Sequence, residues 1–206
     1  MSRLWRDQIQ VFLAPERMII VRFSRGFKPV QISKATVLCQ HVQGAPAWQA
    51  TLQQLEKHLL EAVGTDLTIT LSNHFTRYVT LPPQTEITTP EEVMSYATFR
   101  MREIYAERVD SWVLSVSDWN PVSGAVCAAI PRELMTRLEE LAVRYQFKLK
   151  AVEPYLASVY DRWEKQLNGN RINLAVIENG RICLAILLDG VWQSIRNQRI
   201  LHSVAD

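Results

Sequence analysis

Ser72 and His74 are the residues whose types and spacing come closest to acid–base chemistry. A serine near a histidine can act as a nucleophile beside its base when an acid orients the imidazole. The segment Ser72-Asn73-His74 is also typical of a turn, because serine and asparagine side chains hydrogen-bond the local backbone. It separates two apolar runs, 67–71 and 78–81. We therefore interpret it as a turn between strands and expect no catalytic residue.

Arg77 follows this turn and allows two interpretations. Its guanidinium group could form an ion pair or a backbone hydrogen bond that fixes the turn. Alternatively, it could contact a partner protein. The sequence leaves both interpretations open, and we keep Arg77 as a candidate contact residue.

The carboxylates that flank expected strands follow no metal-binding spacing; they are Asp66, Asp110 and Asp118. A two-metal nuclease needs converging carboxylates, with one at the centre of the first strand. The expected first strand, residues 9–14, carries none. We therefore expect no nuclease activity and no metal site.

The three cysteines, Cys39, Cys127 and Cys183, lie far apart in apolar runs. They lack the paired spacing of a disulfide framework or a zinc site. We expect buried, reduced thiols, and we expect no cofactor.

Charge is nearly balanced over the 206 residues, with a formal net charge of +2. This balance argues against a nucleic-acid-binding protein, which normally presents a basic face. No apolar run approaches the ~20 residues that a membrane span needs, so we expect a cytoplasmic chain without a span. Trp5 lies in the basic N-terminal part, and we expect it to be an exposed partner contact.

Two similar strand groups frame the chain. Three strands of an antiparallel meander are expected at 9–14, 18–23 and 35–42. A second meander is expected at 172–177, 181–188 and 191–196. Its turns contain Asn179-Gly180 and Asp189-Gly190, which are strong hairpin signals.

Helices and further strands lie between the meanders. Helical spacing of Trp48, Leu52, Leu55 and Leu59 predicts a helix before the strand 67–71. Thr89-Pro90 predicts the start of a second helix. The remaining expected elements are strands 111–117, 124–130 and 147–152, a helix after Pro131, and a helix over 154–167.

Several short motifs follow one another along residues 9–196. They are Leu71-Ser72-Asn73, Arg77-Tyr78, Leu81-Pro82, Met94, Tyr96, Ala97, Phe99, Trp112, Ala128-Ala129-Ile130-Pro131 and Val152-Glu153-Pro154. In these motifs the chain resembles the PilM and GspL type of actin-like assembly proteins, which belong to type IV pilus and type II secretion platforms.

The resemblance implies an α/β fold with mixed sheets, the actin-like ATPase superfold built of ribonuclease H-like lobes. Residues 1–146 would form the first lobe with an inserted strand-helix-strand-strand segment. Residues 147–206 would form the start of a second lobe, which we expect to be incomplete.

The resemblance also points to two hairpin turns that hold phosphate in actin-like ATPases. The first turn reads Ala14-Pro15-Glu16; it has no Asp or Gly, and Pro15 has no N–H to donate. The second reads Glu178-Asn179-Gly180 and keeps only part of the pattern. A tight Asn-Gly turn is enough to explain these residues, and a relic phosphate turn is the alternative interpretation. We interpret both as relic phosphate turns at most and expect no ATP hydrolysis and no bound cofactor.

The resulting hypothesis is a non-catalytic cytoplasmic scaffold, peripheral to the inner membrane. The resemblance implies binding of the cytoplasmic tail of an inner-membrane assembly-platform protein, or of a secretion or pilus ATPase. A homo-oligomer is left open. The alternatives are a nucleotide-dependent ATPase or phosphotransferase of the same superfold, and a generic protein-interaction domain.

Overall fold

The computed structural model describes residues 6–24, 26, 29–40, 43–59, 64–167 and 169–200. The chain forms two compact units. Unit 1 comprises Met1–Phe75 and Leu134–Tyr155, and unit 2 comprises Thr76–Glu133 and Leu156–Asp206. Both units combine helices with β-sheets, so the predicted α/β class is confirmed.

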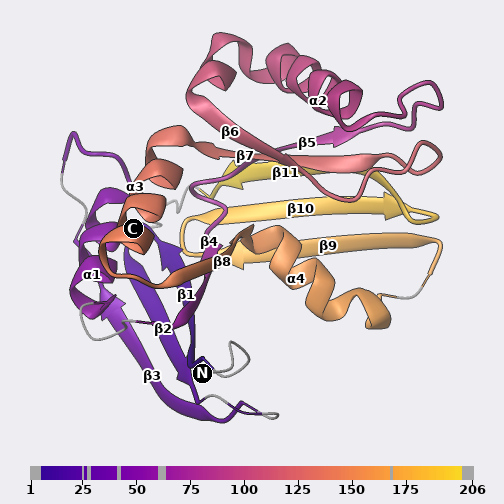
Figure 1. The fold of residues 1–206 in the computed structure, drawn as a ribbon. Coiled ribbons are helices and arrows are strands. Elements are labelled where there is room, and N and C mark those ends of the chain that lie inside the picture. Colours follow the sequence, from indigo (N-terminus) through magenta and orange to yellow (C-terminus); the bar gives the residue numbers. More distant parts are fainter. Residues whose placement is uncertain are drawn as a thin grey trace, which may run out of the picture. The chain divides into compact units, whose positions relative to one another are not determined.

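Unit 1 is built on a mixed five-stranded sheet with the order β3-β2-β1-β4-β8 (Figure 1). Its strands are β1 (Gln8–Ala14), β2 (Arg17–Phe23), β3 (Gln31–Leu38), β4 (Asp66–Leu71) and β8 (Lys148–Pro154). The first three pair antiparallel, whereas β4 pairs parallel to β1 and β8 parallel to β4. The predicted order of a three-strand meander, a helix and a further strand is confirmed.

The core of unit 1 follows from two periodicities. Alternate residues of β1 and β4 are buried, and burial of each such aliphatic side chain contributes about 1.5–3 kcal/mol. Helix α1 (Gln49–Leu59) packs against β1 and β2 with a leucine face. Helix α3 (Arg132–Arg144) lies beside α1 (Figure 1), where Arg144 Nη1 donates to Glu56 Oε1 at 2.7 Å.

The expected bounds of the third strand were wrong. We predicted 35–42, whereas β3 spans Gln31–Leu38 and pairs with β2 from Gln31 opposite Phe23 to Leu38 opposite Arg17. Nearly all of its residues are exposed, because β3 stands at the end of the strand order. A strand exposed on both faces needs no alternation of apolar residues, so its pattern did not mark it.

Unit 2 contains a three-stranded sheet of order β5-β7-β6, made of β5 (Arg77–Leu81), β6 (Trp112–Val116) and β7 (Ala125–Pro131). Helix α2 (Pro90–Tyr105) covers one face of this sheet (Figure 1). The two are joined by a buried cluster that includes Leu81, Ala97, Met101 and Cys127. A short 3-10 helix, η1 (Ala106–Ser111), follows α2.

The start of α2 is confirmed at the predicted cap. Glu92 N donates to Thr89 Oγ1 at 3.3 Å, and Thr89 N donates to Glu92 Oε2 at 3.0 Å. This reciprocal capping box satisfies two backbone donors that a helix start otherwise leaves without partners. Pro90, which has no N–H, occupies the first helical position.

The second meander of unit 2 has the order β11-β10-β9, with β9 (Arg171–Glu178), β10 (Arg181–Leu188) and β11 (Val191–Arg199). Gly180 has φ of 68°, while Asp189 and Gly190 have φ of 48° and 78°, as tight hairpin turns require. Both hairpin predictions are confirmed. Helix α4 (Tyr155–Trp163), followed by η2 (Glu164–Gln166), lies beside this meander (Figure 1), and Tyr160 contacts Trp192 with ring centroids 4.8 Å apart.

The predicted boundary between the two lobes, between residues 146 and 147, rests on the repeated order of elements in the sequence. The compact units are defined by packing, and unit 1 takes in Leu134–Tyr155. Packing and repetition are different criteria, so the two-lobe division stays a prediction.

Gly124 offers a test of the backbone packing in unit 2. It has φ of 73°, and a Cβ there would run into the carbonyl oxygen of Leu81. Gly190 has a similar φ of 78° but nothing within 4 Å of an added Cβ. Gly190→Ala should therefore lower the free energy of unfolding by about 1–2 kcal/mol, the cost of left-handed backbone.

Gly124→Ala should lower it by about 1–3 kcal/mol more, since overpacking is added to the same backbone strain. Urea denaturation followed by circular dichroism measures both. Equal losses in the two variants would contradict the close approach of Gly124 to Leu81.

Candidate functional site

The turn that carries Ser72 and His74 is held by hydrogen bonds within the turn and by one to β1. Ser72 N donates to Leu13 O at 2.8 Å, and Phe75 N donates to Ser72 O at 2.9 Å. The Ser72 hydroxyl oxygen accepts the His74 backbone N–H at 3.1 Å, and Ser72 is fully buried. This is the hydrogen bonding expected of a turn.

A row of charged side chains crosses the second meander in unit 2. Arg181 on β10 lies directly opposite Glu178 on β9 and directly opposite Arg199 on β11. Directly opposed residues point to the same face of a sheet. Glu178 and Arg181 are only 8% and 7% exposed, whereas Arg199 is exposed.

Hydrogen bonds connect this row to the start of β5. Arg181 Nη1 donates to Asn197 Oδ1 at 3.0 Å, and Asn197 Nδ2 donates to the Thr76 carbonyl oxygen at 3.0 Å. Arg77 Nη1 donates to the same carbonyl oxygen at 2.9 Å. We call Arg77, Glu178, Arg181, Asn197 and Arg199 the arginine cluster.

The arginine cluster is electropositive. Burial lowers the pKa of Arg181, and the nearby Arg77 and Arg199 lower it further, while Glu178 acts in the opposite direction. Three guanidinium groups and one carboxylate give the cluster a formal net charge of +2. Arg181 Nε is buried and has no hydrogen-bond partner among the described residues.

The other titratable groups beside the cluster stay protonated near neutral pH. Burial raises the pKa of the Cys183 thiol to about 12, and the charge of Glu178 adds to the effect. Burial, followed by the nearby Cys183, raises the pKa of Tyr78. A thiol must ionise to become a strong nucleophile. At neutral pH the Cys183 thiol and the Tyr78 phenol are therefore not ionised nucleophiles.

Two of the predicted site residues meet in the arginine cluster. Arg77 makes the backbone hydrogen bond of its structural interpretation, and the same guanidinium group lies near Arg181. Glu178 ends β9 in the turn that continues through Asn179 and Gly180, where Gly180 O accepts the Ile200 N–H at 3.0 Å.

The other predicted site residues lie elsewhere. Ala14, Pro15 and Glu16 form the β1–β2 hairpin of unit 1, where Glu16 O accepts the Cys39 N–H at 2.8 Å. Trp5 lies outside the described residues.

The sequence interpretation missed Arg181, Asn197 and Arg199. A usable signal was present for Arg181. In β10 the buried positions alternate as Arg181, Cys183, Ala185 and Leu187, so an arginine occupies the first place of a core-facing series. A charged residue in phase with core residues is rarely buried without a partner.

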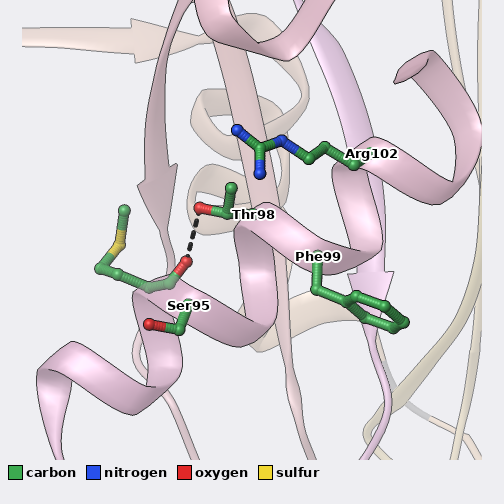
Figure 2. A pocket seen from close by; sticks show the side chains of 5 residues that line it. Ser95, Thr98, Phe99 and Arg102 are labelled. Atoms are coloured by element: carbon green, nitrogen blue, oxygen red, sulfur yellow. Dashed lines mark hydrogen bonds between the residues drawn. The ribbon is translucent and has the colours of Figure 1, made fainter. Parts of the chain in front are cut away.

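A second surface feature is a shallow depression along α2 (Figure 2). It is lined by Met94, Ser95, Thr98, Phe99 and Arg102. Thr98 Oγ1 donates to Met94 O at 2.7 Å, and Arg102 Nη2 forms an ion pair with Asp110 at 2.7 Å. Its polar groups are thus engaged locally, and one helix supplies the whole lining. This arrangement does not converge on a reacting atom.

Within the described ranges, no three His, Cys, Asp or Glu side chains gather as a metal site requires. Cys39, Cys127 and Cys183 are buried and form no disulfide, as predicted. In the same ranges no helix combines the length and apolarity needed to span a bilayer.

Comparisons with solved structures support the fold. A chain of the PilM–PilN type IV pilus biogenesis complex matches with a TM-score of 0.64 at 18% identity, over 96% of this chain and 62% of that one. The cytoplasmic domain of EpsL, an inner-membrane component of the Vibrio cholerae type II secretion system, matches with a TM-score of 0.58 at 12% identity, over 94% and 71%.

A third match is a Bacteroides thetaiotaomicron protein of unknown function with an actin-like ATPase fold. Its TM-score is 0.63 at 10% identity, over 97% of this chain and 72% of that one. No protein-family model and no curated protein matches the chain. The chain therefore has an actin-like fold similar to those of the PilM–PilN and EpsL structures, and it spans 62% of the first of them.

Asn197 tests how the arginine cluster is held together. Asn197→Ala removes the bonds to the buried Arg181 and to the Thr76 carbonyl. It should lower the free energy of unfolding by about 2–3 kcal/mol, because buried polar groups lose their partners.

Gln198→Ala is the matched control, since Gln198 is exposed on the opposite face of the same strand. It should change stability by less than about 0.5 kcal/mol. Chemical denaturation measures both variants. An equally small effect of Asn197→Ala would show that the described bonds do not hold the cluster.

Proposed function

We propose that the chain is a non-catalytic actin-like scaffold that binds a cytoplasmic segment of an inner-membrane protein in a pilus or secretion platform. The observation that carries the proposal is the fold. More than nine-tenths of the chain matches a PilM–PilN structure and the EpsL cytoplasmic domain with TM-scores of 0.64 and 0.58. On this proposal the scaffold works in the cytoplasm, at the inner membrane.

The turn chemistry supports a role without ATP hydrolysis. The β1–β2 turn presents Pro15, which has no N–H, and contains no glycine that would let backbone approach a phosphate. In unit 2, the thiol and phenol beside the arginine cluster are held protonated by burial. Binding of a partner needs neither a phosphate turn nor an ionised nucleophile.

An ATPase or phosphotransferase is the alternative within the same fold. It is favoured by the β9–β10 turn, which places Glu178 next to Asn179 and the left-handed Gly180. The alternative accounts for one turn only. A pilus or secretion ATPase as a second partner, and self-association, are extensions of the scaffold proposal.

Co-purification tests the partner. The tagged full chain is co-expressed with inner-membrane proteins encoded by neighbouring pilus or secretion genes. In one experiment these proteins are intact, and in a second their cytoplasmic tails are removed. Retention of the intact proteins and loss of the truncated ones is the expected result, because the scaffold binds the tail. Retention of neither form would contradict the proposal and leave a generic interaction domain.

Phosphate release from Mg-ATP tests the alternative. The wild-type chain should release phosphate no faster than the same chain after heat denaturation, because its first turn cannot bind phosphate as a glycine turn does. Release above that level that is lost in Glu178→Gln and kept in Glu153→Gln, a change in unit 1, would establish the ATPase instead.

A further inference from the structure

The arginine cluster has a property that a scaffold does not require. Its side chains come from three strands of unit 2 and from the residue that begins β5, and they bring positive charge to one face of the second meander. We propose that the arginine cluster is a binding site for one oxyanion group, a carboxylate or a phosphate, held by guanidinium side chains. This inference goes beyond the scaffold function.

Like charges face each other in the arginine cluster. Arg181 and Arg199 are directly opposed across β10 and β11. Directly opposed residues have Cβ atoms about 4.5–5.5 Å apart, and like charges at that separation destabilise a sheet. Arg77 Nη1 donates to the Thr76 carbonyl oxygen, and Asn197, which accepts from Arg181, donates to the same oxygen. An anion bound between the guanidinium groups of Arg181, Arg199 and Arg77 would attract each of them and offset their mutual repulsion.

The side chains of the arginine cluster carry more positive than negative charge. Glu178 is the cluster's acidic member and lies directly opposite Arg181. One carboxylate beside three guanidinium groups leaves a formal net charge of +2. Because Arg181 is only 7% exposed, water screens this charge poorly. A bound carboxylate or phosphate would offset this positive charge.

The guanidinium group of Arg181 provides hydrogen-bond donors for an anion. A guanidinium group has five N–H donors in a fork that fits two oxygens of one carboxylate or phosphate. Arg181 Nη1 donates to Asn197 Oδ1 at 3.0 Å. The buried Nε of Arg181 has no hydrogen-bond partner among the described residues. The bond to Asn197 orients the fork, which reduces the ordering needed when an anion binds.

One end of the arginine cluster is accessible to a ligand from solvent. Burial decreases along the row from Arg181 to the exposed Arg199, so one end of the site is open to solvent. Arg77 is half-buried. A charged ligand can thus reach a poorly solvated guanidinium group through an exposed one. Charge-assisted hydrogen bonds are about twice as strong as neutral ones.

Thermal unfolding in inorganic phosphate tests the site, with sodium chloride adjusted to constant ionic strength. The melting temperature of the wild-type chain should rise saturably, by about 3 °C at a tenfold excess of phosphate over its dissociation constant. Arg199→Gln should lose this rise, because it removes the exposed member of the row. Arg77→Gln provides a second variant with the same expected loss.

Arg196→Gln is the matched control. Arg196 is exposed on the same strand but lies opposite Leu184, on the other face of the sheet. It should keep the full phosphate-dependent rise. Phosphate also stabilises proteins by exclusion from their surface, and this general effect is the same in every variant.

The same scans in chloride alone give an independent readout. Arg199→Gln should melt at the same or a higher temperature than Arg196→Gln, since it removes repulsion from Arg181. Acetate in place of phosphate separates the ligand chemistries: a saturable rise with acetate assigns a carboxylate, and a rise with phosphate alone assigns a phosphate group. Absence of any saturable rise in the wild type, or equal rises in Arg199→Gln and Arg196→Gln, overturns the proposal.

Discussion

A guanidinium group that lies inside a β-sheet must receive hydrogen-bond acceptors and a counter-charge, because an unpaired buried charge is very unfavourable. In unit 2 this requirement falls on Arg181. Glu178 stands directly opposite it on β9, and Asn197 on β11 accepts its hydrogen bond. Asn197 also binds the carbonyl oxygen that precedes β5. The register of the second meander, which places Glu178 and Asn197 beside Arg181, is thus linked to the start of β5 through one buried cation.

Much of the fold could be predicted because burial leaves a periodic record in the sequence. Apolar runs bounded by turn residues predicted β1 and β10, helical spacing predicted α1, and Asn179-Gly180 and Asp189-Gly190 predicted the hairpins. β3 was misplaced because a strand exposed on both faces leaves no such record. The actin-like superfold followed from the order of elements and a few motifs, and the structural matches confirm it.

The site could be predicted only in part. Arg77 and Glu178 were singled out for separate reasons, one as a contact residue and one as part of a turn. They are linked through the hydrogen bond between Thr76 and Asn197, which lie 121 positions apart. Local patterns carry no information on such a pairing. Arg181 was detectable as a charge in phase with core residues, but its partners follow only from the strand register.

The edge position of β3 has a consequence for the exchange of its amide hydrogens with solvent. β3 pairs antiparallel with β2 and stands at the end of the described strand order. In such a pairing, successive N–H groups point alternately toward the neighbouring strand and away from it. Deuterium uptake along residues 33–38, where the pairing is regular, should therefore alternate between slow and fast with a period of two residues, and the slow positions report the opening of the sheet from its edge.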